Sequence, residues 1–164
     1  MTTAAPSSTS SAAGSARPAR GVLEEVVSAS ATKPGYVVFA VPGSQYRLHL
    51  RTAPGAPAID PSRVGKRLVG VIRCEARRVD LVQQGGRLIE PLVGRPRRVH
   101  GIVEAQDPAG GTIVVSAGGS SAVDGVDVPI VARLMDPRQR PDQFPVGALV
   151  AFDVFDGATI TPGG

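Results

Sequence analysis

Short apolar runs recur along most of this chain, and segments rich in Gly, Pro and small polar residues separate them. Within many runs apolar and polar residues alternate, which is the period of a half-buried β-strand. No apolar period of helical spacing extends far enough to compete. The pattern therefore predicts an all-β protein. The expected strands cover residues 20–31, 36–41, 45–51, 63–74, 78–82, 87–92, 99–105, 112–117, 126–134, 147–155 and 158–161.

The same order of segments occurs twice, at an offset of 76–82 residues. The matching segments are 21–24 with 101–104, 35–39 with 111–115, and 64–65 with 146–147. A period this long, filled with strand-like runs, indicates two similar small β domains in tandem rather than a solenoid. In each copy the longest connection falls between the third and fourth strands, which is the layout of a five-stranded OB-type barrel.

We therefore expect two tandem OB-like small barrels after a disordered N-terminal tail. The expected segments are a tail over residues 1–19, a basic first barrel over 20–93, a linker over 94–98 and an acidic second barrel over 99–164. The Asp-Gly pair at 156–157 should form a hairpin turn before the last strand. Residues 87–92 either complete the first barrel or bridge the two.

The first 19 residues are almost all Ser, Thr, Ala and Pro, so they cannot bury enough apolar surface to become ordered. They lack the apolar core of a signal peptide, and no run in the chain approaches the roughly 18 apolar residues of a membrane span. The single cysteine, Cys74, excludes an internal disulfide and fits a reducing compartment. We expect a soluble, cytoplasmic protein with no membrane contact.

The net charge of +4 hides an uneven distribution. Residues 1–98 carry 15 Lys and Arg against 6 Asp and Glu, whereas residues 99–164 carry 3 against 8. A basic half suggests binding to a polyanion such as nucleic acid. Alternatively, the two copies attract each other, within one chain or between chains. Both interpretations stay open at this point.

Three segments resemble those of the cold-shock domain, a compact member of the OB-type barrels. Residues 35–39 (GYVVF) and 45–49 (QYRLH) are similar to the two ring-bearing strands of that family, and residues 144–154 (FPVGALVAFDV) resemble its acidic-Gly-x-x-Val-x-Phe-x-Val strand. In that family the two ring-bearing strands present aromatics and a His to single-stranded DNA or RNA. The resemblance implies this role for Tyr36 and His49.

The sequence departs from the family at the other ring positions. Val38 and Arg47 stand where aromatics are expected in the first copy, and Thr112, Val114 and Arg133 occupy the ring and His positions of the second. The whole chain has only four Phe, two Tyr and no Trp. We therefore expect weak binding with little sequence preference.

Strand alternation selects the candidate binding residues. In the third strand Tyr46, Leu48 and Leu50 share one face, so Arg47, His49 and Arg51 share the other. The candidates are basic or aromatic residues expected on the surface of the first barrel: Lys33, Tyr36, Arg47, His49, Arg67 and Arg73. Tyr36 would stack a base, His49 would stack or hydrogen-bond, and the cations would neutralise phosphates. The competing interpretation is a solvated polar face, or cations that discourage strand edges from pairing.

No motif indicates an enzyme, a cofactor or a metal. His49 and His100 fall in different copies, and Cys74 lacks a second Cys at ligand spacing and should be a small core residue. No paired carboxylates, nucleophilic triad or glycine fingerprint stands out. We expect a non-enzymatic protein whose basic first barrel binds single-stranded DNA or RNA weakly. The alternative is a structural or adaptor module that forms homo-oligomers or binds a protein partner through its oppositely charged copies.

Overall fold

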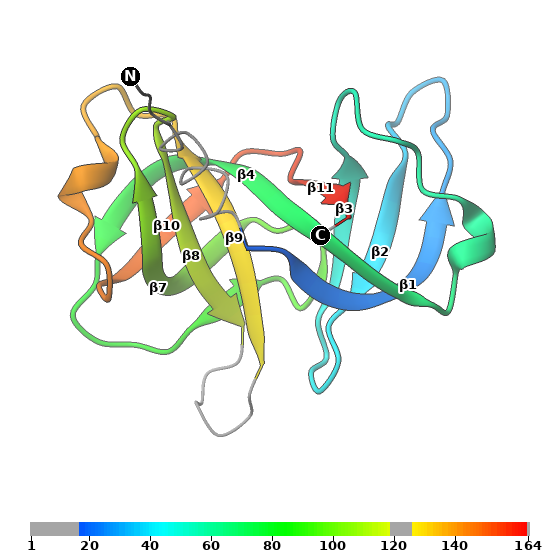
Figure 1. Ribbon diagram of the computed structural model, residues 1–164, viewed down its shortest axis with the longest axis horizontal. Helices are drawn as coiled ribbons and strands as arrows, with labels where there is room; N and C mark the ends of the chain where they lie inside the picture. Colours follow the sequence, from blue (N-terminus) through cyan, green and yellow to red (C-terminus); the bar gives the residue numbers. More distant parts are fainter. Residues whose placement is uncertain (1–16, 119–125, 164) are drawn as a thin grey trace, which may run out of the picture.

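The computed structural model of the protein describes residues 17–118 and 126–163, which are built almost entirely from β-strands (Figure 1). The helical elements of that part are two short 3-10 helices, η2 (Pro61–Arg63) and η4 (Pro141–Gln143). The predicted all-β class is confirmed. The strands are β1 (Ala19–Val27), β2 (Tyr36–Ala40), β3 (Arg47–Thr52), β4 (Arg67–Leu81), β5 (Leu88–Glu90), β6 (Val93–Gly94), β7 (Arg98–Asp107), β8 (Thr112–Gly118), β9 (Asp127–Leu134), β10 (Leu149–Val154) and β11 (Thr159–Pro162).

The strands pair in two closed circuits that meet at β4. In the first circuit the order is β1, β2, β3, β11 and β4, and β4 pairs again with β1. In the second it is β4, β10, β7, β8 and β9, and β9 pairs again with β4. With 15 residues, β4 is long enough to place its first half in one circuit and its second half in the other. Figure 1 shows it running diagonally between the two groups of strands.

Each copy completes its circuit with a strand that continues from the other copy. β11, at the end of the chain, lies between β3 and β4, parallel to the former and antiparallel to the latter. In the same way, the second half of β4 lies between β9, to which it is parallel, and β10, to which it is antiparallel. The predicted hairpin of residues 147–155 with 158–161 is therefore wrong. The connection through Gly157 (φ +116°) leads the chain to the first circuit, where Ile160 is fully buried and the edges of β3 and β4 gain a partner.

The sequence repeat corresponds to repeated atomic contacts. Gly21 in β1 and Gly101 in β7 each lie so close to the next strand that a Cβ would sit 2.5 Å from a backbone oxygen. A β-bulge follows in both strands, after Leu23 and after Val103. The carbonyls of these two residues then accept hydrogen bonds, at 2.7 and 2.8 Å, from the segments that precede β4 and β10. The repeated Gly is thus required by close strand packing.

The structure also differs from the strands predicted within residues 63–82 and clarifies the role of residues 87–92. The predicted strands at 63–74 and 78–82 are replaced by one continuous strand, β4, which begins only at Arg67 and ends at Leu81. The charged residues between the two predicted strands stand on its outer face, while Ala76 and Val79 are buried. Residues 87–92 bridge the two circuits, since β5 pairs with β7 and the following β6 pairs with β3. The division into separate domains at residues 94–98 stays a prediction, and strand pairs cross it.

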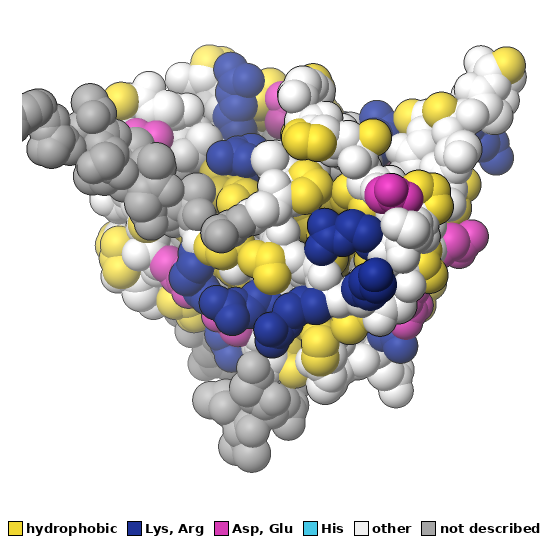
Figure 2. Space-filling model, turned by 45° about the vertical axis from the view of Figure 1, so that its right-hand side comes forward, with side chains coloured by type: hydrophobic (Ala, Val, Ile, Leu, Met, Phe, Trp, Pro, Cys, Tyr) yellow, Lys and Arg dark blue, Asp and Glu magenta, His cyan; other side chains and the backbone are white. Residues whose placement is uncertain are grey.

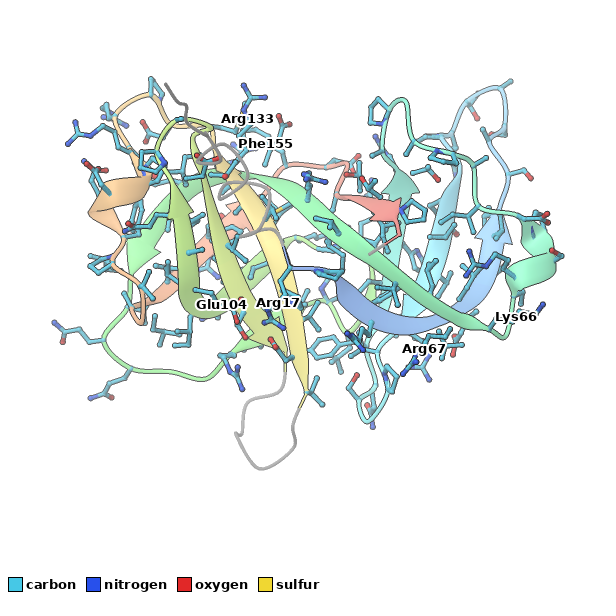
Figure 3. The ribbon with its side chains drawn as sticks, viewed as in Figure 1. Arg17, Lys66, Arg67, Glu104, Arg133 and Phe155 are labelled. Atoms are coloured by element: carbon cyan, nitrogen blue, oxygen red, sulfur yellow. The ribbon has the colours of Figure 1, made fainter. Side chains whose placement is uncertain are left out.

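The predicted N-terminal tail extends too far. Residues 1–16 lie outside the described part, but Ala19 already begins β1 and is only 2 % exposed. Arg17 donates to Glu104, beside which it lies in Figure 3, and to Asp127, both at 2.6 Å. The pKa of Arg17 is raised chiefly by the hydrogen bond with Glu104. Both carboxylates come from the second copy, so the composition of the tail could not reveal them.

One continuous apolar core links the two circuits. It contains Phe39 from the first copy, Phe152 from the second and the inward residues of β4 from Leu68 to Val79. Cys74 is among them, as predicted. Because the core is shared, each exchanged strand should contribute to the stability of the whole described chain.

Shortening Ile160 tests the contribution of β11. Ile160→Ala removes most of a fully buried side chain, and such a change typically lowers the free energy of unfolding by about 2–5 kcal/mol. The control is Val146→Ala, at a residue that is 62 % exposed, which should change it by less than about 0.5 kcal/mol. Urea-unfolding curves measure both values. Identical curves for the wild type and Ile160→Ala would contradict the exchange of β11.

Candidate functional site

Two ring side chains stack on each other at the outer face of β2 and β3. Val38 is the cross-strand partner of His49, and Tyr36 lies two residues before Val38, so the rings are diagonal neighbours. Their centroids are 4.6 Å apart and their planes differ by 15°. Both side chains are half-buried, while Leu48 and Leu50 anchor β3 in the core. The ring pair is therefore held on a firmly packed support.

The ring pair lines a cavity of about 480 Å³, which we call the ring pocket. Small-molecule sites typically measure about 300–1,000 Å³. Four cations, Lys33, Arg51, Arg95 and Arg97, and one carboxylate, Asp156, line the same cavity. They come from the turn before β2, from β3, from the segment between β6 and β7, and from the connection between β10 and β11. Flat rings beside an excess of cations suit a ligand that is both aromatic and anionic.

Asp156 is paired with two of the four cations. Its Oδ2 accepts a hydrogen bond from Arg51 Nη2 at 3.2 Å and from Arg95 Nη1 at 2.9 Å. These side chains are between 35 % and 54 % exposed, so each pair contributes only about 0–1 kcal/mol. In residues 17–118 and 126–163, neither Lys33 nor Arg97 is paired with a carboxylate. Those two cations are available to an anionic ligand.

Three of the six predicted site residues, Lys33, Tyr36 and His49, come together in the ring pocket. Arg47 shares the outer face of β3 with His49, but its Nε is paired with Glu24 at 2.8 Å and it does not line the cavity. The ion pair explains its separation from the pocket, because it holds the side chain towards β1.

Arg67 and Arg73 lie outside the ring pocket, on the outer face of β4. Arg73 is the cross-strand partner of Thr159, which is in turn the partner of Arg51, so the register places Arg73 two strand spacings, about 10 Å, from the edge of the pocket. Arg67 precedes Arg73 by six residues, or about 20 Å of extended strand. Figure 3 shows Arg67 near Lys66 at the start of β4.

Lys and Arg side chains form a band across one face of the molecule, on which neither histidine is visible (Figure 2). Arg20 of β1 lies diagonally across from Arg67 because its direct partner is Val69. Arg20, Arg67 and Arg73 are all exposed, and we call these three the β4 face. The predicted cations therefore divide between the ring pocket and the β4 face, apart from the ion-paired Arg47.

Sequence reasoning missed Arg51, Arg95, Arg97 and Asp156 as site residues. For Arg51 a signal existed, since strand alternation already placed it on the face of His49. Arg95 and Arg97 fall in the predicted linker and Asp156 in the predicted hairpin turn. The pairing of β6 and β11 with β3 brings these segments to the pocket. No local pattern reports a pairing between segments so far apart in the chain.

Several ion pairs join the basic part of the sequence to the acidic part within one chain. In the part that the structure describes, five ion pairs join a cation of the basic residues 1–98 to a carboxylate of the acidic residues 99–164. They are Arg17 with Glu104, Arg17 with Asp127, Arg51 with Asp156, Arg95 with Asp156, and Arg98 with Asp153. The pair of Arg98 with Asp153 lies inside the second circuit, between β7 and β10, whereas the two pairs of Arg17 join the segment before β1 to that circuit.

Comparisons of this chain with protein-family models, with curated proteins and with solved structures find no match. Among the described residues, no three His, Cys, Asp or Glu side chains are grouped so that they could hold a metal ion. Across those same ranges, no helix combines the length and the apolar character needed to cross a membrane. The resemblance to the cold-shock domain stays a prediction.

Cys74 should be chemically silent in the folded protein. Burial raises the pKa of its thiol to about 12, so the reactive thiolate is nearly absent at mildly alkaline pH. A chromogenic disulfide reagent should therefore label Cys74 only after denaturant has unfolded the chain, and absorbance measures the labelling. Rapid stoichiometric labelling of the native protein would show that this part of β4 is not buried.

Proposed function

We propose that this protein binds single-stranded nucleic acid with low sequence specificity and without enzymatic activity or a cofactor, and that the ring pocket is the binding site. In this proposal each circuit is an OB-like barrel, and the first is the binding unit. The observation that carries it is the stacked pair of Tyr36 and His49 in a pocket lined by four cations.

The strand order supports OB-like barrels. Each circuit has five strands, and the longest connection in each copy joins the third strand to the fourth, through η2 in the first copy and η4 in the second. Each circuit also closes on itself, because β4 pairs with β1 and with β9. Barrels of this type bind oligonucleotides on the surface of their strands, and the ring pocket opens on such a surface.

The ring pocket can hold the two parts that all nucleotides share. A base stacks on an aromatic ring through its flat face, which every base has, and such stacking is worth about 1–3 kcal/mol per base. Lys33, Arg51, Arg95 and Arg97 can neutralise neighbouring phosphates, which carry no sequence information. The site therefore favours binding of any sequence over recognition of one.

The β4 face can extend the contact beyond the pocket. A single-stranded nucleic acid that leaves the pocket at Arg51 can cross β11 to Arg73 and then follow β4 to Arg67. This path is about 30 Å long. OB-type folds cover about 4–16 nucleotides, and a path of this length suits several of them. Arg67 and Arg73 then serve as secondary phosphate contacts.

The alternative function is an adaptor whose acidic copy docks on the basic copy of another chain. It requires carboxylates that are free to pair between chains. Within the described ranges, six carboxylates of the acidic copy already have a partner in their own chain: Glu104, Asp127, Asp136, Asp142, Asp153 and Asp156. This favours nucleic-acid binding. Light scattering at low and high salt distinguishes the two functions. Oligomers that dissociate in high salt, in a protein that does not bind oligonucleotides, would support the adaptor.

Replacing Tyr36 tests the stacking interaction. Tyr36→Leu keeps an apolar side chain but no ring, so it should weaken binding by about 5–150-fold, which corresponds to about 1–3 kcal/mol. Tyr36→Phe keeps the ring and should bind like the wild type. Fluorescence anisotropy with a labelled oligonucleotide of about ten nucleotides, at low ionic strength, measures the affinities. The proposal fails if the wild type does not bind, or if the two variants bind equally.

The salt dependence tests the phosphate contacts. Each phosphate contact of a single-stranded nucleic acid contributes about −0.7 to the slope of log affinity against log salt, so the four pocket cations together should contribute at most about −3. Arg97→Gln should make the slope shallower by about 0.7. The control is Arg138→Gln, at a side chain that is 84 % exposed and paired with Asp136 in the acidic copy, which should leave the slope unchanged. If the two substitutions change the slope equally, the nucleic acid does not bind at the ring pocket.

A further inference from the structure

Asp156 is an unexpected group in a pocket that receives an anion. Among the described residues it is the one carboxylate that lines the ring pocket. Its negative charge repels every phosphate that approaches, and at low local dielectric that repulsion increases. A carboxylate in such a place is compatible with binding where it contacts a neutral hydrogen-bond donor of the ligand.

The Asp156 carboxylate is held at one oxygen and open at the other. Oδ2 accepts hydrogen bonds from both Arg51 and Arg95, whereas Oδ1 accepts none from residues 17–118 and 126–163. The next residue, Gly157, has a φ of +116°, and a Cβ there would lie 3.2 Å from Arg51 Nη1. This glycine lets the Arg51 guanidinium pack against the turn. The turn thus orients the carboxylate and leaves one acceptor oxygen unused.

The sugar is the part of a nucleotide that the other pocket groups leave without a partner. The ring pair can stack with the base, and the cations can neutralise the phosphates. A ribose carries a 2′-hydroxyl that can donate a hydrogen bond, and a deoxyribose lacks it. Carboxylates also hold ribose hydroxyls in dinucleotide-binding folds.

We propose that Asp156 makes the ring pocket select RNA over DNA, by accepting a hydrogen bond from a ribose 2′-hydroxyl of the strand whose binding is the proposed function. Arg51 and Arg95 are positioning residues, because they hold the carboxylate through its other oxygen. Towards DNA the same carboxylate offers no attraction and only repels the phosphates.

Three labelled oligomers that differ only in the sugar test this selection on the full chain. They are oligouridine with ribose, with deoxyribose and with 2′-O-methylribose, all of one length, and the last keeps the 2′-oxygen but cannot donate. The ribose form should bind about tenfold more tightly than the other two, as expected for one hydrogen bond to a charged acceptor. Anisotropy titrations measure the three affinities.

Substitutions assign the preference to Asp156. Asp156→Ala should bring the three affinities together and should strengthen binding of the deoxyribose form, because the repulsion is gone and two guanidinium groups are released. The control Asp153→Ala removes the same charge three residues away, from a carboxylate paired with Arg98 at 2.8 Å outside the pocket, and should keep the tenfold preference. Asp156→Asn, which keeps the shape but not the charge, should show a reduced preference, and unfolding curves check that all variants fold.

Each contrary outcome has a distinct meaning. Equal binding of ribose and deoxyribose forms by the wild type overturns selection by Asp156 and leaves the proposed function standing. If Asp156→Ala shifts all three affinities by one common factor, the residue acts only on Arg51 and Arg95, and the proposal is again overturned. If none of the oligomers binds, both proposals fail together.

Discussion

The pairing of strand edges is the constraint on which the rest of this structure depends. A strand with an unpaired edge exposes backbone donors and acceptors that must find partners elsewhere. β11 satisfies the edges of β3 and β4, and the second half of β4 does the same for β9 and β10. Since each of these strands continues from the other copy, the two circuits share one backbone strand and one apolar core. The copies are similar in pattern, yet neither circuit is complete without the other.

The exchange of strands also assembles the candidate site. Asp156 and Gly157 belong to the connection that carries the chain from β10 into the first circuit, and they reach Arg51 only because β11 pairs beside it. Arg95 arrives from the segment after β6, which pairs with the other end of β3. The ring pocket is therefore formed by three distant parts of the chain, with β3 at its centre. Its electrostatic character follows from the same arrangement, because one acidic residue of the second copy lies among cations from the first copy and from the linker.

The local pattern of apolar and polar residues correctly predicted which face of a strand each side chain occupies, because that depends on the strand alone. Alternation placed Leu48 and Leu50 inside and His49 outside, and it placed Cys74 in the core. The resemblance to a cold-shock domain directed attention to Tyr36 and His49, which do stack. Pattern failed where the partner of a strand had to be known. It assigned the last strand to a hairpin with its neighbour, and it divided β4 because charged residues interrupt the outer face but leave the inner face apolar.

The amino-acid sequence by itself determined the all-β class, the internal repeat, the faces of the strands and the separation of charge between the copies. These properties depend on residue types and on spacings of a few positions, which the chain carries whatever its partners are. Only the tertiary structure decided which strand completes which circuit, and therefore which side chains meet in the ring pocket. The physical reason is that backbone hydrogen bonds between strands are the same for every residue type except Pro, so pairing is chosen by the packing of the whole core.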